Sequence, residues 1–236
     1  MNSLVSTFSS ALITRQFLRG AILPLTLLAG CFAMPQTHAA TITWTNNAAG
    51  NWNVAANWSP NQVPGAADTA VLANGQTVSV TTPTTVGGFN LTSGNLNSTS
   101  PLTVNGVMNW TGGGVSSGST LTIAAPGLLN LTNAVQRDIP GTTINNAGTV
   151  VWSAGTLTGG AGTVFNNSGL WHVQGDNIFL GANFGGSSTF TNTGTFRKSV
   201  ATGTTTLSAT GFHNTGTVDL QSGTLNFGST LTGNGT

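Results

Sequence analysis

Few side chains of this 236-residue chain can do acid–base, nucleophilic or metal chemistry. Only 4% of the residues are charged, and there is neither a glutamate nor a tyrosine. After residue 40 the chargeable side chains are Asp68, Asp138, Asp176, Asp219, Arg137, Arg197, Lys198, His172 and His213. Such groups could act as general acids or bases, which needs two or more of them close together on one surface.

The local sequence around these residues predicts turns and surface positions rather than a catalytic cluster. Arg137 and Asp138 in QRDIPG and Asp176 in QGDN have the neighbours of turn residues. Asp68, after PGAA, is expected to accept backbone N–H groups in a turn, and His172 to face outward from a strand. No metal-ligand spacing, nucleophile elbow or phosphate loop occurs. We therefore expect no catalytic residue, no cofactor site and no metal site, in a protein that is not an enzyme.

The elements that carry these residues follow a repeated phrase of the type Asn-Asn-x-Gly-Thr. It appears in TINNAGTVVW, TVFNNSGLWHV, TFTNTGTFRK and GFHNTGTVDL. The glycines that mark the phrase and its weaker copies are Gly106, Gly127, Gly148, Gly169, Gly194 and Gly216, spaced 21, 21, 21, 25 and 22 residues apart. Such a period is typical of a repeat protein in which each unit is one coil.

Three columns flank these glycines at fixed offsets. Four residues before them stand Leu102, Ile123, Ile144, Phe165, Phe190 and Phe212. Two residues after them stand Met108, Leu129, Val150, Trp171, Phe196 and Val218. Four residues after them stand Trp110, Leu131, Trp152, Val173, Lys198 and Leu220. All but one of these positions are apolar, and their alternation with polar neighbours predicts strands with one buried face.

Two corners are expected in each repeat. The marking glycine supplies a positive φ or allows a close backbone approach, and asparagine tolerates the left-handed region. Asparagine recurs two residues before the glycine, and stacked amides would bond to one another as an internal ladder: Asn146, Asn167, Asn192 and Asn214. A second corner is expected near Gly113, Gly155 and Gly223.

These patterns predict an all-β fold, a right-handed parallel β-helix (β-solenoid) with coils of about 22 residues. A β-sandwich or barrel does not require like residues in six consecutive repeats, and a leucine-rich repeat needs a helical side that is absent here. We assign residues 77–236 to the solenoid, with about seven coils. Phe190 is expected to stack between Phe165 and Phe212.

Residues 40–76 form a head segment rich in tryptophan and proline. Trp44, Trp52 and Trp58 lie within fifteen residues of one another. A cluster of aromatic rings beside turns is able to stack on sugars, but the first coil of a solenoid also needs a cap over its core. We favour the cap.

Residues 1–39 have the layout of a secretory signal peptide. Arg15 and Arg19 precede the apolar run AILPLTLLAGCFAM, which is too short to span a bilayer as a helix, and small residues follow. Cleavage before Ala40 would leave a mature chain without cysteine or transmembrane helix. A competing lipobox, LAGC, would make Cys31 a lipidated first residue, so a lipoprotein stays an alternative.

The head GNWNVAANWSPNQVPGAADTAVL and the Asn-Asn-x-Gly-Thr coils together resemble secreted bacterial β-helical surface proteins. These are the passenger regions of autotransporters and filamentous-haemagglutinin-like adhesins. The resemblance implies export to the outer membrane surface or beyond, and a structural or adhesive function. Glycans or host and biofilm surface components are the implied partners. The sequence stops at TLNFGSTLTGNGT, where another corner is due, so we expect a truncated solenoid whose open C-terminal coil self-associates.

Two other classes of function compete with adhesion. A polysaccharide-acting lyase or hydrolase would use a cluster of the chargeable residues. An ice-binding protein would use a flat threonine array, but Thr149, Thr195 and Thr217 share their column with Leu128 and Leu170. A formal net charge of +1 argues against a nucleic-acid partner, which needs a basic surface.

Overall fold

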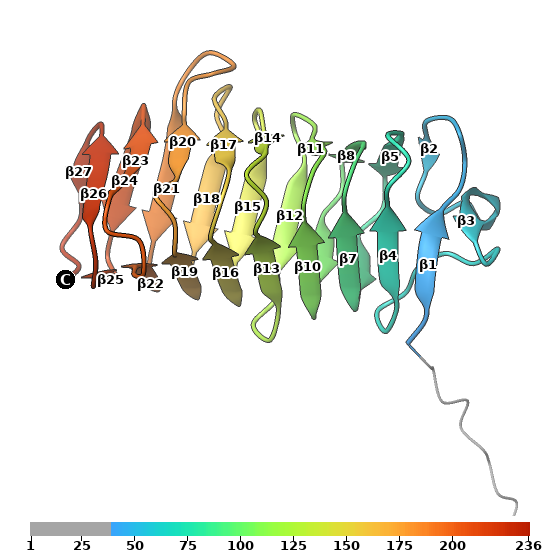
Figure 1. Cartoon of the computed structure of the whole chain (residues 1–236). Helices are drawn as coiled ribbons and strands as arrows, with labels where there is room; N and C mark the ends of the chain where they lie inside the picture. Colours follow the sequence, from blue (N-terminus) through green and yellow to red (C-terminus); the bar gives the residue numbers. More distant parts are fainter. Residues whose placement is uncertain (1–38) are drawn as a thin grey trace, which may run out of the picture. The chain divides into compact units, whose positions relative to one another are not determined.

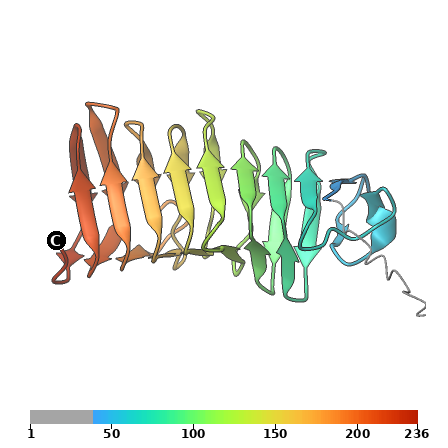
Figure 2. The same ribbon diagram turned by 90° about the horizontal axis from the view of Figure 1, so that it is seen from below.

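A computed structural model describes residues 39–236 and shows an all-β parallel solenoid. The described residues belong to one unit, Thr37–Thr236, and contain a single short 3-10 turn, η1 (Ala55–Asn57). About eight coils of about 21 residues stack from the blue to the red end of this unit (Figures 1 and 2). The predicted fold class is therefore confirmed, whereas the signal-peptide and lipobox predictions concern residues that lie, apart from Ala39, outside the described part of the chain.

Each coil from Thr69 onward contributes one strand to each of three sheet faces. Sheet A contains β3 (Trp58–Ser59), β1 (Thr41–Trp44), β4 (Thr69–Leu72), β7 (Gly88–Leu91), β10 (Val107–Trp110), β13 (Leu128–Leu131), β16 (Thr149–Trp152), β19 (Leu170–Val173), β22 (Thr195–Lys198) and β25 (Thr217–Leu220). Sheet C contains β6 (Thr84–Val86), β9 (Leu102–Val104), β12 (Thr120–Ile123), β15 (Thr143–Asn146), β18 (Val164–Asn167), β21 (Ser188–Asn192), β24 (Thr210–Asn214) and β27 (Leu231–Thr232).

The third face is divided into two sheets. Sheet B contains β2 (Gly50–Asn51), β5 (Thr77–Val80), β8 (Asn95–Ser98) and β11 (Gly114–Val115). Sheet D contains β14 (Gln136–Asp138), β17 (Thr156–Thr158), β20 (Ile178–Leu180), β23 (Thr204–Ser208) and β26 (Thr224–Gly228). Hydrogen bonding between coils is parallel throughout, apart from the antiparallel pair of β1 and β3.

The register of sheet A is the one that the sequence columns predict. Met108 pairs with Leu129, Val150 with Trp171, and Trp171 with Phe196. On sheet C the ring of Phe190 stacks between two others, with centroids 5.4 Å from Phe165 and 5.1 Å from Phe212. The core is thus a set of apolar ladders that run along the stacking axis.

Two predicted pairings on sheet C, both of Ile123, are wrong. Leu102 and Ile144 each pair with Leu121, whereas Ile123 pairs with Val104 and Asn146. The corner between β12 and β13 is two residues longer than its neighbours and is closed by the Gly127 N–H, which donates to the Ala124 carbonyl. Counting back from Gly127 therefore places the residues of β12 two positions out of register.

The marking glycines are explained by close packing and not by a positive φ. A Cβ atom on Gly148 would overlap the Gly127 carbonyl oxygen of the preceding coil, and one on Gly169 would overlap that of Gly148. Left-handed glycines occupy the second corner instead, with φ of 75° at Gly113 and 89° at Gly155. Asparagine is not needed for a left-handed turn here, because Asn146 and its counterparts belong to strands.

The head segment buries its three tryptophans against the first coil. Trp44, Trp52 and Trp58 are at most 2% exposed, and their rings pack edge to face. Trp52 also contacts Phe89 of β7, with ring centroids 5.9 Å apart. No face of these rings is open for stacking on a sugar, so the aromatic cluster covers the core as a cap does. Parallel pairing nevertheless extends into residues 40–76, because β1 and β4 already continue sheet A.

Candidate functional site

The outward face of sheet A carries a central column with one residue from each coil. In order along the axis these are Val71, Asn90, Asn109, Asn130, Val151, His172, Arg197 and Asp219. Period-2 alternation in each strand turns these side chains away from the core. Val151 separates a neutral amide half from a half with titratable side chains.

The neutral half is a half-buried, outward-facing asparagine ladder. Asn109 Nδ2 donates to Asn90 Oδ1, and Asn130 Nδ2 donates to Asn109 Oδ1, both at 2.9 Å. Each coil therefore presents a planar amide to solvent at the strand spacing of about 4.8 Å. An uncharged array of donors and acceptors suits many weak hydrogen bonds to a repeating ligand.

The titratable half forms a compact polar patch on β19, β22 and β25 and the residues that follow them. We define the polar patch as His172, Gln174, Arg197, Ser199, Asp219 and Gln221. Short contacts join these side chains in two groups of three, which are adjacent because His172 pairs with Arg197. In the first group His172 Nε2 lies 2.7 Å from Ser199 Oγ, and its Nδ1 lies 3.4 Å from Gln174 Nε2. Asp219 Oδ2 accepts from Arg197 Nε at 2.7 Å and from Gln221 Nε2 at 2.9 Å.

The environment of His172 favours its neutral form. Partial burial lowers the pKa of the imidazole below its ordinary value, and the neighbouring Arg197 lowers it further. Asp219, one coil beyond Arg197, acts in the opposite direction with a smaller effect. A neutral imidazole can accept a hydrogen bond from Ser199 or donate one to it, depending on its tautomer.

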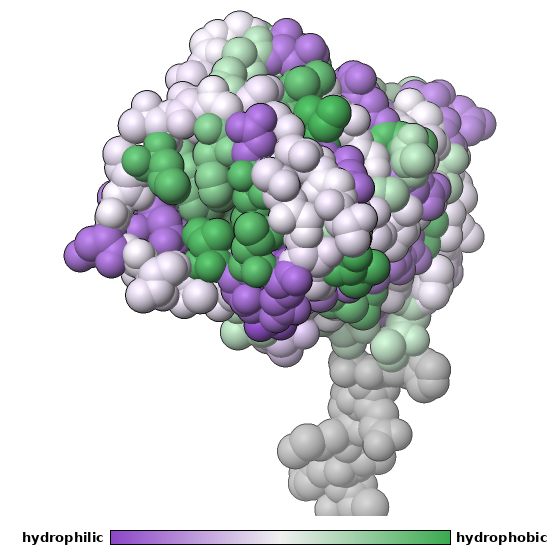
Figure 3. Space-filling model, turned by 60° about the vertical axis from the view of Figure 1, so that its left-hand side comes forward, coloured by the Kyte–Doolittle hydropathy of each residue, from purple (hydrophilic) through white to green (hydrophobic). Residues whose placement is uncertain are grey.

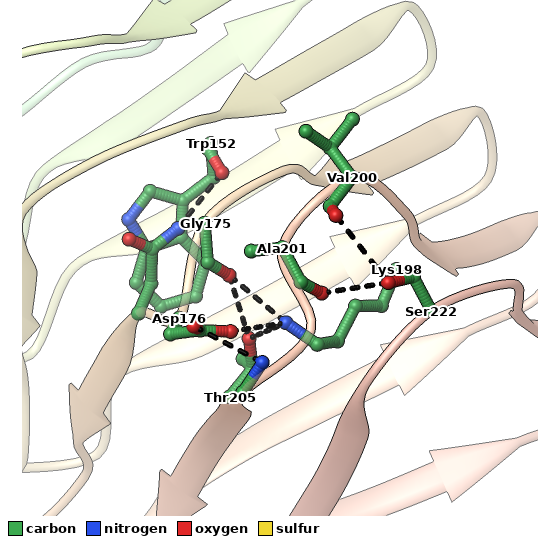
Figure 4. A network of polar contacts seen from close by, with 10 residues as sticks. Trp152, Gly175, Asp176, Lys198, Val200, Ala201, Thr205 and Ser222 are labelled. Carbon is green, nitrogen blue, oxygen red and sulfur yellow. Dashed lines mark hydrogen bonds and ion pairs between the residues drawn. The ribbon is translucent and has the colours of Figure 1, made fainter.

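An ion pair between the buried Lys198 and the exposed Asp176 holds the end of β22 (Figure 4). Lys198, the one exception in the apolar columns, has a side chain with 0% exposure. Its Nζ donates to Asp176 Oδ1 at 2.9 Å, and to the Gly175 carbonyl and Thr205 Oγ1 at 3.1 Å each. All three donors of the ammonium group are satisfied, which a buried charge requires. Asp176 Oδ2 also accepts from the Gly203 N–H, so Asp176 holds the following loop as well as the lysine.

Arg137 is also buried, and the prediction of a turn at Arg137 and Asp138 is wrong, because both residues lie in a strand. It lies in the strand β14, and its guanidinium donates to backbone carbonyls, including that of Trp110 at 2.9 Å and that of Asn133 at 3.2 Å. Burial lowers its pKa to about 10, so it remains protonated at neutral pH. Asp138 is exposed and accepts from Gln136 Nε2 at 2.8 Å. Arg137 therefore satisfies inward-pointing carbonyls and is not available to a ligand.

A shallow groove of about 290 Å³ lies beside sheet C. Its lining includes Thr122, Asn145, Asn166 and Thr191, one residue from each of four coils. Asn166 Nδ2 donates to Asn145 Oδ1 at 2.9 Å, which repeats the amide-to-amide contact of sheet A. A second uncharged surface that follows the stacking axis is thus present.

The two remaining chargeable residues lie outside the polar patch, although His213 pairs with Thr191 of the groove beside sheet C. Asp68 accepts from the Gly65 N–H at 2.9 Å and from the Ala40 N–H at 3.0 Å, which confirms its predicted turn role. His213 belongs to β24 on sheet C, where Nδ1 lies 3.0 Å from Thr232 Oγ1, so the two histidines occupy different faces. The sequence prediction missed the alignment of His172 with Arg197 and Asp219. All three stand three residues after a marking glycine, and that column would have revealed them.

Apolar side chains gather in a hollow at the C-terminal end of the solenoid (Figure 3). The hollow has a volume of about 370 Å³, and Val218, Phe227 and Leu231 contribute to its lining. Phe227 packs on Phe212 with ring centroids 4.4 Å apart. The face beyond the last coil is thus apolar like the interior.

Within residues 39–236, no three His, Cys, Asp or Glu side chains converge as a metal site would require. No helix of this part of the chain is long and apolar enough to cross a membrane. No protein-family model, curated protein or solved structure matches the sequence or the fold.

Proposed function

We propose that this chain is an exported, non-catalytic β-helix module that serves at the bacterial cell surface or in the extracellular space as a structural and adhesive element. The observation that carries the proposal is the pair of outward polar columns, on sheets A and C, that continue from coil to coil without a deep pocket. Such surfaces favour repetitive ligands such as glycans, for which affinity comes from many weak contacts in series.

The decisive experiment combines a glycan array with a reducing-sugar release assay on the purified protein. Adhesion predicts binding of one or more glycans without release of new reducing ends. Sugar release that depends on His172 or Asp219 would instead establish the alternative, a polysaccharide lyase or hydrolase. The polar patch is the observation that favours this alternative, because it holds an imidazole, a guanidinium and a carboxylate together. Asp176→Asn is a poor test, because Asp176 neutralises the buried Lys198.

Export is tested by the N-terminal residue of the protein recovered from the expressing cells. Cleavage of the signal peptide predicts Ala40 as the first residue and no incorporated lipid. Labelling of Cys31 by radioactive palmitate would identify a lipoprotein and reject the preferred cleavage. Either result locates the module outside the cytoplasm, whereas an uncleaved cytoplasmic chain would contradict the proposal.

Self-association is proposed for the apolar face beyond β25 and β26. Val218 and Leu225 are only partly buried against the core there, and Leu231 is 56% exposed. A further coil covers such a face by parallel pairing, and a second copy of the chain offers the same strands. Sedimentation of the purified protein should show oligomers whose size increases with protein concentration. Leu231→Lys should reduce them, and a strictly monomeric protein at all concentrations would refute this part of the proposal.

A further inference from the structure

Arg197 has an unused binding edge. Its Nε is taken by Asp219, but its two η nitrogens donate to no other group among residues 39–236. The side chain is 36% exposed, so this edge is open to solvent on the outward face of sheet A. Among residues 39–236, Arg197 is the only arginine with free η nitrogens, because the guanidinium of Arg137 donates to backbone carbonyls.

The side chains around the η edge of Arg197 suit a ligand that carries one anionic group with hydroxyl groups next to it. His172 on one side is held neutral by burial and by Arg197, and Asp219 on the other side faces Nε. Ser199 and Gln174 contact the ring of His172 and add a hydroxyl and an amide to the same polar patch. No other titratable side chain lies in this outward column.

The geometry of a guanidinium edge selects the kind of anion. Two parallel N–H groups match the two oxygens of a planar carboxylate and form a bidentate pair. The outward-facing ladder of Asn90, Asn109 and Asn130 continues the same column and offers neutral partners for further hydroxyl groups. A ligand that lies along the column therefore meets a carboxylate site at one end and amides at the other.

We propose that the polar patch binds the carboxylate of an acidic glycan, a uronic-acid-containing polysaccharide, through the η edge of Arg197. This rests on the proposed glycan-binding function and assigns its ligand class. Asp219 positions the guanidinium and, because its charge partly cancels that of Arg197, keeps the affinity of a single site low. Useful binding then requires several patches on a surface, as expected of an adhesive element.

The test uses oligogalacturonate as the probe and its methyl ester as the neutral control, with binding to the immobilised full chain measured at low salt. Esterification should weaken binding about tenfold, the expected loss of one charge-assisted bidentate pair. Arg197→Lys keeps the positive charge but loses the two parallel N–H groups of the guanidinium, so it should weaken binding of oligogalacturonate about fivefold or more. Asp219→Asn should strengthen binding of oligogalacturonate, because it removes the carboxylate that competes with the ligand for Arg197.

A matched control lies in the same column. Asn130→Ala should leave the ratio of acidic to neutral binding unchanged, since Asn130 contributes only amide contacts. Circular dichroism confirms that each variant is folded. Equal binding of acid and ester, or insensitivity to Arg197→Lys, would overturn this inference while leaving the adhesive function intact. Stronger binding of dextran sulfate than of oligogalacturonate would overturn the choice of a carboxylate, and failure to bind any glycan would remove both proposals.

Discussion

Two asparagine ladders run along this solenoid, one inside and one outside. The inner ladder joins Asn146, Asn167, Asn192 and Asn214 by Nδ2 to Oδ1 contacts of 2.7 Å, at exposures of 7% or less. The outer ladder joins Asn90, Asn109 and Asn130 by the same type of contact at 2.9 Å. The residue type and the spacing are alike, but the inner ladder lies on the core side of sheet C and the outer ladder on the outward side of sheet A.

Burial gives the two ladders different functions. Each inner amide spends its second N–H on a backbone carbonyl of a neighbouring coil, as when Asn167 donates to Thr195 at 3.1 Å and Asn192 to Thr217 at 3.0 Å. Any break leaves polar groups without water, which costs about 1–3 kcal/mol for each group. The outer amides exchange their partners with water at little cost, so they are free to exchange them with a ligand.

The largest effect is expected next to the inner ladder. Phe190 and Asn192 share β21, and Phe190→Ala removes a ring stacked on both sides. We expect a loss of about 3–5 kcal/mol of unfolding free energy, as for other large core truncations. Urea denaturation measures it and sets the scale for the amide variants. A loss below about 1 kcal/mol would mean that the phenylalanine column is not continuous.

Asn192→Ala is expected to cost nearly as much. The substitution leaves Asn167 Nδ2 and Asn214 Oδ1 without their hydrogen-bond partner on Asn192, and it creates a small cavity. The expected loss is about 2–4 kcal/mol, measured in the same denaturant series. An effect no larger than that of an outer-ladder variant would show that water enters the inner ladder, and the distinction between the ladders would fail.

The alternation of side chains between the two faces of a strand is enough to predict which ladder is buried. Residues two before a marking glycine share a face with the apolar column four before it, and residues three after it oppose the apolar columns at two and four. This reasoning predicted the inner ladder and the sheet A core. It failed at Ile123, because the longer corner at Gly127 is invisible to counting, and it did not extract the column of His172, Arg197 and Asp219.

The buried cations could be only partly inferred from the sequence. Lys198 stands in an apolar column and so demands a carboxylate partner, but Asp176 lies in a loop 22 residues earlier, where no strand parity applies. The burial of Arg137 could not be predicted, because its partners are backbone carbonyls, which every residue possesses. Loop and corner geometry, rather than strand pattern, limits prediction from such a sequence.

The start of the inner ladder offers a smaller test. Asn146 Oδ1 is buried without a hydrogen-bond partner, because the residue that pairs with Asn146 on β12 is Ile123. Ile123→Asn would extend the ladder by one amide and satisfy this acceptor. The substitution should cost about 1 kcal/mol less in the natural chain than in an Asn146→Leu background. Equal costs in the two backgrounds would indicate that the added amide does not reach Asn146.

The outer ladder should respond little to truncation. Asn109 contacts amides on both sides at 2.9 Å, but solvent can replace both contacts. Asn109→Ala should therefore change the unfolding free energy by about 0.5 kcal/mol or less. Denaturation beside Asn192→Ala gives the direct comparison. A loss above about 2 kcal/mol would show that the outer ladder, too, is structural.

The smallest effect concerns His172 and appears only as a dependence on pH. Burial and Arg197 lower its folded pKa below the ordinary value of 6.5, so the unfolded chain takes up this proton first as the pH falls. The contribution to stability is complete above about pH 6.5 and is lost as the pH falls from there through the folded pKa. His172→Gln keeps a polar contact to Ser199 and removes this titration. The drop in unfolding free energy between pH 7.5 and pH 5 should therefore be smaller in the variant, and the imidazole resonances of the natural chain should titrate His172 below its ordinary pKa. An identical drop in both proteins would show that the polar patch does not hold the imidazole neutral.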